Sequence, residues 1–323
     1  MNLDRRGFIA GVAGSLAAPF AHAQDAYPSR QVRVIMPFPA GSGTDTLARL
    51  IAEQLAKRWG QSVIVDNMSG AGGNIGGQTV THAAPDGYTL LFVPAPPLVI
   101  NQFMYKHQGY EPLKLTPISM IASVPYAMVV RKDFPATNVK EFVAYAKANP
   151  GKVTYASSSV GSTAHLAAVQ LQMMTGVQMV HVPYRGAAPA LNDVMGGHID
   201  MVFDIVSTAR PMWEANMVKV FATGGKTRSR IMPTIPTMEE AGFPGYLAVT
   251  WFAMTAPPGT PAPVIDRIYA GVIEALNIPE VAERIRGLGM DSVGMNPADS
   301  GRYFAREADM WSKIVKAAAI SLD

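Results

Sequence analysis

A strand pattern that passes through a glycine-rich turn into a helix pattern constrains the fold of this chain more than any other feature. Residues 32–36 (VRVIM) have the composition of a short buried strand, and the turn PFPAGSGTD follows at residues 37–45. Residues 46–59 then place apolar side chains on one face at helical spacing, up to Gly60. A strand, a short turn and a helix in this order are typical of α/β proteins with a parallel sheet.

The same order of elements recurs along the chain, although we find no true sequence repeat. A second glycine-dense turn at residues 67–77 follows a strand pattern. In the second half, a strand pattern at residues 152–156 leads into the turn SSSVGST at residues 157–163, before a helix pattern that ends at Gly176. Because strand and helix patterns alternate, we predict an α/β fold.

Two long extended runs, at residues 118–130 and 247–256, divide the chain. One outgoing and one returning crossing are what two lobes joined by a two-stranded hinge require. We therefore expect a first lobe from residues 24–123 and 251–323, a second lobe from residues 124–250, and a ligand cleft between them.

The first residues have the pattern of an export signal rather than of a folded element. Arg5 and Arg6 form a twin-arginine pair, an apolar stretch of small residues follows, and an A-x-A cleavage site ends at Ala23. The apolar stretch is too short for a transmembrane helix. We expect residues 1–23 to be a twin-arginine signal peptide that is cut after Ala23, which places the mature protein in the periplasm. A general secretory signal with a chance arginine pair is the alternative.

The charge and the cysteine count exclude several classes of function. The chain has a net charge of +3, and removal of residues 1–23, which hold two arginines and one aspartate, leaves +2. There is no basic stripe, so a nucleic-acid partner is not expected. The absence of cysteine excludes disulfides and cysteine-based metal or nucleophile chemistry.

Catalytic motifs are incomplete or wrongly spaced. Ser162 and His165 would lie in the same first turn of a helix, where side chains three apart stack along the axis rather than form a relay. The Gly-Lys-Thr run at residues 225–227 lacks the earlier glycine of a phosphate-binding loop. We expect His181 to pack or to hydrogen-bond rather than to contact a ligand. No catalytic residue, cofactor or metal site is therefore predicted, and we do not expect an enzyme.

The turns at residues 40–45 and 157–163 are candidate anion-binding sites. Each is small and polar and precedes a helix, whose first N–H groups and positive dipole end attract a negative charge. An ordinary capped turn, with Thr44 or Asp45 as the N-cap, is the alternative for the first turn. Asp204 ends a strand pattern, where α/β proteins bind ligands, and an N-cap is its alternative role.

Several motifs together resemble one family. In chain order they are PFPAGSGTD at residues 37–45, GAGGNIG at 70–76, PDGYTLL at 85–91, HVPYRG at 181–186 and PTMEEAG at 236–242. This series resembles the solute-binding proteins of tripartite tricarboxylate transporters, the Bug receptor family. The likeness covers the chain from Tyr27 nearly to its end. Met68-Ser69 and Val160 depart from the usual pattern, and Val160 falls in the part of the pocket that varies with the ligand.

The resemblance implies a fold and a function. The fold is a two-lobed periplasmic binding protein of type II-like topology, which closes around a small carboxylate. The carboxylate is a mono- or dicarboxylate, aromatic acids included, and it is delivered to a two-subunit integral membrane permease. A monomer is expected. The alternative is an extracytoplasmic carboxylate sensor that signals to the periplasmic domain of a sensor kinase.

The resemblance also implies that the two turns supply backbone and hydroxyl donors to the ligand, helped by ordered water, and that Asp204 has a role. The expected ligand-binding residues are Phe38, Ala40, Gly41, Ser42, Thr44, Asp45, Ala95, Ser158, Ser159, Gly161, Ser162, Thr163 and Asp204.

Overall fold

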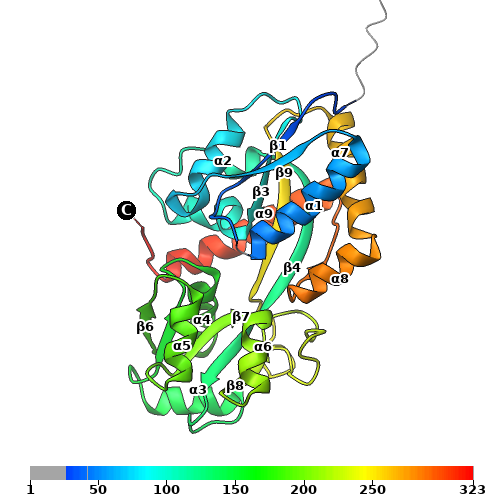
Figure 1. The fold of residues 1–323 in the computed structure, drawn as a ribbon. Helices are drawn as coiled ribbons and strands as arrows, with labels where there is room; N and C mark the ends of the chain where they lie inside the picture. Colours follow the sequence, from blue (N-terminus) through cyan, green and yellow to red (C-terminus); the bar gives the residue numbers. More distant parts are fainter. Residues whose placement is uncertain (1–26, 42, 323) are drawn as a thin grey trace, which may run out of the picture.

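The computed structural model describes residues 27–41 and 43–322, and over this range the chain forms two α/β lobes that meet along a narrow waist (Figure 1). The expected signal peptide at residues 1–23 and the expected ligand-binding residue Ser42 lie outside the described residues. Each lobe has a twisted sheet with helices on both sides, as the alternating strand and helix patterns predict. No helix in the described part of the chain combines the length and the apolar character that crossing a bilayer requires.

The first lobe has a sheet in which three parallel strands are followed by an antiparallel one. Across the sheet, the strands are β2 (Val63–Asn67), β1 (Val32–Met36), β3 (Thr89–Pro94), β9 (Val249–Ala256) and the first half of β4 (Thr116–Arg131). β1 is parallel to both neighbours, and β9 is antiparallel to β3 and β4. The short strand β10 (Asp291–Ser292) pairs with β4.

The second lobe repeats this topology. Its strands are β6 (Val180–Pro183), β5 (Thr154–Ser157), β7 (Met201–Ile205), the second half of β4 and β8 (Val218–Thr223). β5 is parallel to β6 and to β7, whereas β4 is antiparallel to β7 and β8. In each lobe, a strand that comes from the other lobe thus lies antiparallel beside a strand of the parallel set: β9 lies beside β3, and β4 lies beside β7.

Strands β4 and β9 form the hinge. They pair from Thr116 with Ala256 to Pro125 with Val249, and the Tyr126 amide then donates to the Ala248 carbonyl at 2.9 Å. Beyond this point β4 belongs to the second sheet. Both extended runs seen in the sequence are therefore strands that cross between the lobes. The exact division of the chain at residues 123 and 250 stays a prediction.

Helices cover both sheets. In the first lobe they are α1 (Gly43–Trp59), α2 (Asn74–Thr81), α7 (Ala262–Leu276), α8 (Pro279–Gly287) and α9 (Pro297–Ala317), with single helical turns η1 (Ala71–Gly73), η2 (Pro96–Ile100), η3 (Asn101–Phe103) and η4 (Pro112–Lys114). In the second lobe they are α3 (Val139–Ala148), α4 (Thr163–Thr175), α5 (Ala187–Met195) and α6 (Val206–Glu214).

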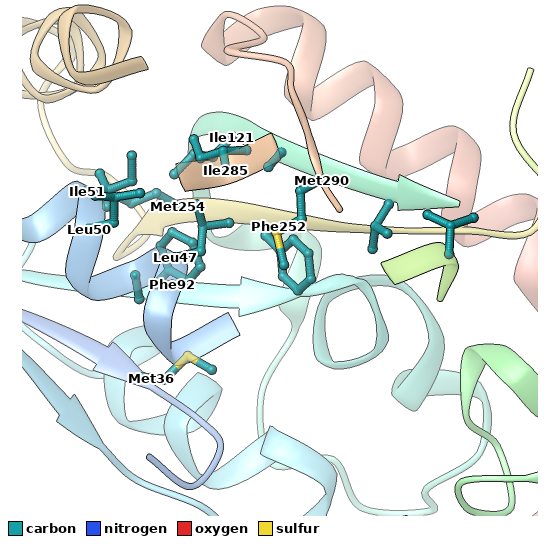
Figure 2. Packing of buried hydrophobic residues seen from close by; sticks show 14 of the residues in the cluster. Met36, Leu47, Leu50, Ile51, Phe92, Ile121, Phe252, Met254, Ile285 and Met290 are labelled. Carbon is teal, nitrogen blue, oxygen red and sulfur yellow. The ribbon is translucent and has the colours of Figure 1, made fainter. Parts of the chain in front are cut away.

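Helix α1 forms as its sequence predicts. Leu47, Leu50, Ile51 and Leu55 lie on its buried face, and the helix ends before Gly60, which has a φ of +65° that suits glycine. The buried face packs against α7 and the sheet. Figure 2 shows Leu47, Leu50 and Ile51 in this core, and Phe252 beside Met290 in the same cluster.

Helix α9 runs from the first lobe along the waist, and its end brings the C-terminal residues beside the junction of the lobes (Figure 1). It packs against β4, η2 and α4, so it touches both lobes. The amide of Leu322 donates to the Met104 carbonyl at 3.0 Å, which fixes the tail after α9 to the first lobe.

Candidate ligand-binding cleft

A cavity of about 370 Å³ lies between the two lobes. Its wall includes residues of both turns that are predicted to bind an anion, of the hinge strands and of the C-terminal tail. The lining residues are Phe38, Gly43, Thr44, Gly72, Pro94, Pro96, Asn101, Met104, Tyr105, Val124, Tyr126, Ser158, Ser159, Val160, Gly161, Ser162, Thr163, Ile205, Thr250, Phe252, Met290 and Leu322.

The predicted ligand-binding residues divide into two groups. Those that line the cavity are Phe38, Thr44, Ser158, Ser159, Gly161, Ser162 and Thr163. Those that belong to neighbouring segments but are not part of the lining are Ala40, Gly41, Asp45, Ala95 and Asp204. The structure gives the positions of these residues. Their roles in ligand binding stay predictions.

Asp45 holds the shape of the first turn. Its carboxylate accepts hydrogen bonds from the Gly41 amide at 3.0 Å, from Arg49 Nε at 3.0 Å and from Asn67 Nδ2 at 2.9 Å. Burial raises the pKa of Asp45, but the hydrogen bonds from Arg49, Gly41 and Asn67 outweigh it and leave this pKa below its usual value. Gly41 has a φ of +87°, so the turn requires glycine there.

The idea that Thr44 or Asp45 is the N-cap of the following helix is wrong. Helix α1 begins at Gly43, so both residues lie in its first turn. Of the two, Thr44 lines the cavity.

The second turn is built around the start of α4. Ser162 is the N-cap of this helix: its Oγ accepts from the His165 amide at 3.3 Å and donates to the Ser159 carbonyl at 2.8 Å. The Gly161 amide donates to His165 Nδ1 at 3.0 Å. These bonds hold residues 159–162 against the helix end, with Ser162 still on the cavity wall.

Two stacked histidines support this turn from outside the cavity lining. The rings of His165 and His181 lie face to face, with centroids 3.9 Å apart and planes within 8°, and Tyr155 stacks on His181. His181 Nε2 is hydrogen-bonded to Ser157 Oγ at 2.7 Å. Burial, and then the neighbouring His181, lower the pKa of His165 to about 4, so the pair is neutral at pH 7. The prediction that His181 packs and hydrogen-bonds is confirmed.

Asp204 lies at the end of β7, beside the cavity wall. Its Oδ1 accepts from the Ile205 amide at 2.8 Å, and burial raises the pKa of its carboxyl group. The structure contradicts an N-cap role, because Ile205 is the N-cap residue of α6. Burial, and then the charge of Asp204, also raise the pKa of the Tyr126 hydroxyl.

The cavity wall among the described residues carries no charged side chain. Its polar groups are hydroxyls, the Asn101 amide and the backbone at the starts of α1, α4 and α6, which reach the wall at Gly43, Thr163 and Ile205. Helix N-termini have N–H groups without partners inside the helix and the positive end of the helix dipole. The cavity can therefore stabilise an anion without a cation in its wall.

No group of three or more histidine, aspartate or glutamate side chains within the described ranges is arranged to hold a metal ion. Ser162 Oγ bonds to the backbone groups of Ser159 and His165.

Several lining residues were not predicted. Val124 and Tyr126 alternate on β4, as do Thr250 and Phe252 on β9, so the two-residue period of a strand could have placed each pair on one face. Asn101, Met104, Tyr105, Met290 and Leu322 come from helical turns, a loop and the tail. No local pattern marks them, because only the packing of α9 and the lobes brings them to the cavity.

Comparisons with known proteins agree with this geometry. A family model described as "Tripartite tricarboxylate transporter family receptor" matches residues 47–320. The Protein BugT of Bordetella pertussis (strain Tohama I) is 33% identical over 321 residues, which cover 98% of this chain and 98% of BugT.

Two solved structures are similar over nearly the whole chain. The structure of Rpa4515 of R. palustris with adipate has a TM-score of 0.79 and 35% identity, and the match covers 91% of this chain and 99% of that one. The structure of MatC from Rhodopseudomonas palustris with bound malate has a TM-score of 0.76 and 31% identity, and the match covers 90% of this chain and 100% of that one.

Proposed function

This chain belongs to the tripartite tricarboxylate transporter family of receptors, and we propose that it captures a small carboxylate between its two lobes and delivers it to a two-subunit membrane permease. As a member of this family it is a solute-binding receptor and not an enzyme. Two similar proteins have structures with the carboxylates adipate and malate.

The observation that carries the proposal is that helix N-termini and hydroxyl groups meet around a cavity whose described wall has no charged side chain. Thr44, Ser158 and Ser162 place hydroxyls on its wall, beside the starts of α1 and α4. Hydrogen bonds to a charged acceptor contribute about 1.5–3 kcal/mol each, roughly twice those between neutral groups. An arginine in the same place would remain desolvated and unpaired in the empty cleft, which costs several kcal/mol.

Calorimetry with matched ligands tests this proposal. We expect hexanoate or another small carboxylate to bind and the corresponding neutral amide to bind at least tenfold more weakly, because the amide brings no charge to the helix N-termini. Equal affinity for acid and amide would contradict the anion-binding mechanism. If no acid in a broad carboxylate screen binds to the protein, the proposed function itself is contradicted.

We further infer that Ala40, Gly41, Asp45 and Ala95 act by shaping the lobe 1 side of the cleft rather than by direct contact. Asp45 accepts the Gly41 amide, and Ala95 lies between the lining residues Pro94 and Pro96. Asp204 would act through Tyr126 and Ile205, or through a ligand hydroxyl or amine. An Asp204→Asn variant is then expected to change the order of preferred ligands more than the total affinity for carboxylates.

Delivery to a permease and signalling to a sensor kinase remain two possible uses of the same binding event. The description of the family as a transporter receptor favours delivery. Uptake of a radiolabelled ligand by cells tests it: loss of uptake on deletion of this protein, with uptake restored by a plasmid copy, supports transport. Unchanged uptake together with a lost transcriptional response to the ligand would support sensing.

A further inference from the structure

We propose that Asn101 is a specificity-determining residue of this cleft, and that it selects a carboxylate with a second group that donates a hydrogen bond, a hydroxyl or an amine. This inference rests on the proposed function, because it names the class of carboxylate that the same cleft takes. It also gives a role to the glycine-dense turn GAGGNIG at residues 70–76, which the two anion-binding turns do not include.

The glycine-dense turn holds the side chain of Asn101 by its amide nitrogen. Asn101 is the first residue of η3, is 3% exposed and lines the cavity. Its Nδ2 donates to the Gly72 carbonyl at 3.0 Å and to Asn74 Oδ1 at 2.8 Å. These two bonds use both hydrogen atoms of the side-chain amide.

Glycine at position 72 permits this approach. Gly72 has a φ of +62°, which L side chains rarely adopt. A Cβ atom built on it would lie 2.7 Å from Tyr105 Oη and 3.3 Å from Asn101 Nδ2. Because glycine avoids both the strained backbone and the crowding, the carbonyl of this residue can accept from Asn101.

Neighbouring backbone carbonyls fix which way the Asn101 amide points. A carbonyl only accepts, so the Gly72 carbonyl requires the nitrogen of Asn101 to face it. At the other end, Gln108 Nε2 donates to the Pro97 carbonyl at 2.9 Å and to Asn74 Oδ1 at 3.3 Å. Asn74 therefore presents its oxygen to Asn101. A reversed Asn101 amide would place its own oxygen against these two acceptors.

The atom that Asn101 offers to a ligand is therefore Oδ1. Within the described part of the chain, no group donates a hydrogen bond to this atom. Asn74 Nδ2 is sealed in the interior without a partner, but Asn101 Oδ1 is not. The small accessible part of Asn101 lies on the cavity wall, so we expect Oδ1 to be reached from the cavity.

This oxygen differs from the other polar side-chain groups of the described wall, which are serine, threonine and tyrosine hydroxyls. A hydroxyl can rotate to donate to a carboxylate, whereas an amide oxygen only accepts. A ligand carboxylate at Asn101 would set two acceptors against each other. An apolar group there would leave Oδ1 without a partner in a cleft that the ligand fills, which is also unfavourable. An O–H or N–H group on the ligand avoids both.

Two series of matched acids test this selectivity. Succinate, malate and aspartate share a carbon chain and carry hydrogen, hydroxyl or ammonium at the same carbon. Butanoate, 3-hydroxybutanoate and 3-aminobutanoate form the second series. By isothermal titration calorimetry on the mature protein at pH 7.5, with both enantiomers of each substituted acid, we expect at least one substituted acid to bind at least tenfold more tightly than its parent.

The result for the acids separates this inference from the proposed function. If each parent acid binds as tightly as its substituted forms, or if none of the six acids binds while another carboxylate does, the inference is overturned and the proposed function stands. If no carboxylate of a broad screen binds, both are overturned. The hydroxyl and amine members of each series show which donor the cleft prefers.

Asn101→Ala and Gln102→Ala are matched variants, since each removes a carboxamide from η3 but only Asn101 lines the cavity. For the preferred substituted acid, we expect Asn101→Ala to lower the ratio of its affinity to that of the parent at least fivefold. Gln102→Ala should leave this ratio as in wild type. An unchanged ratio in Asn101→Ala, or an equal fall in both variants, would overturn the role of Asn101. Circular dichroism checks that both variants are folded, and the acid series on the wild type decides if one is not.

Discussion

At the scale of single residues, the cleft depends on groups that never touch its interior. The stacked pair of His165 and His181 supports the turn at residues 157–163 through two hydrogen bonds. The Gly161 amide donates to His165 Nδ1, and Ser157 Oγ is hydrogen-bonded to His181 Nε2. A protonated His165 has no lone pair at Nδ1 to accept that bond. The shape of this turn is therefore linked to a neutral imidazole.

The pH dependence of stability follows from this link. The pKa of His165 falls from 6.5 to about 4 on folding, so the unfolded chain binds more protons between these values. His165 therefore adds on the order of 3 kcal/mol to the free energy of unfolding above about pH 7. This contribution is lost as the pH falls from 6.5 toward 4. Urea denaturation at several pH values measures it.

His165→Asn is the matched variant, because its Oδ1 can accept from the Gly161 amide without titrating. We expect the variant to lose less stability than wild type between pH 7 and pH 4.5. A pH profile identical to that of wild type would show that His165 does not carry the effect.

Two glycines of the second lobe allow a sharper test of the cleft wall. Gly151 and Gly161 have φ values of +70° and +76°, so alanine at either position costs about 1–2 kcal/mol of stability. Nothing lies within 4 Å of a Cβ on Gly151, whereas a Cβ on Gly161 would displace the end of Met104. We expect similar losses in denaturation experiments for the two variants, but weaker ligand binding only for Gly161→Ala. Equal affinities in both would indicate that Met104 does not shape the ligand site.

At the scale of elements, the starts of helices combine a structural and a functional role. Ser162 caps α4 on the cavity wall, and Asn138 caps α3 in the same lobe, where its side chain accepts from the Glu141 amide at 3.0 Å. Both caps satisfy an amide that the helix leaves unpaired. Only the first lies on the cavity wall.

Replacement of either cap by alanine should lower the free energy of unfolding by about 1 kcal/mol, within a range of 0.5–2. We expect Ser162→Ala also to weaken carboxylate binding, by about 1–3 kcal/mol if its hydroxyl group turns from the Ser159 carbonyl to donate to the ligand. Asn138→Ala should leave binding unchanged. If Ser162→Ala binds as wild type does, the residue is a structural cap alone.

At the scale of the whole molecule, β4 and β9 join the lobes by a short paired segment that ends at Pro125 and Val249. Beyond it, contacts between the lobes include the packing of α9 against α4 and an ion pair between Arg230 and Asp291. Two paired strands are suited to a hinge, whose closure a ligand that touches both lobes would favour.

Small-angle scattering tests this closure with the ligand that calorimetry identifies. We expect the radius of gyration to decrease when the ligand is added at saturating concentration, because the bound carboxylate contacts turns from both lobes. A variant that folds but does not bind, such as Gly161→Ala if its affinity is lost, is the control. An unchanged radius with full occupancy would indicate a cleft that is already closed.

Much of this architecture is encoded locally. The apolar face of α1, the glycine that ends it and the two extended runs depend on short-range spacing, so the sequence alone predicts the α/β class and the crossing strands. The two turns were found in the same way, because a small polar turn before a helix has a local signature. The resemblance to a receptor family adds to these patterns, and the comparisons confirm it.

The rest required the tertiary structure. Asp45 belongs to a turn with a recognisable pattern, but the carboxylate points to Gly41, Arg49 and Asn67, and only the packing of β2 beside β1 brings Asn67 there. Met104 and Leu322 are far apart in the chain and carry no motif, yet they meet Gly161 at the cavity. Local sequence patterns determine which segments become strands, turns and helix starts, because those choices depend on neighbouring residues. The wall of the cleft depends on contacts between distant segments, which arise only when the lobes and the C-terminal tail have packed.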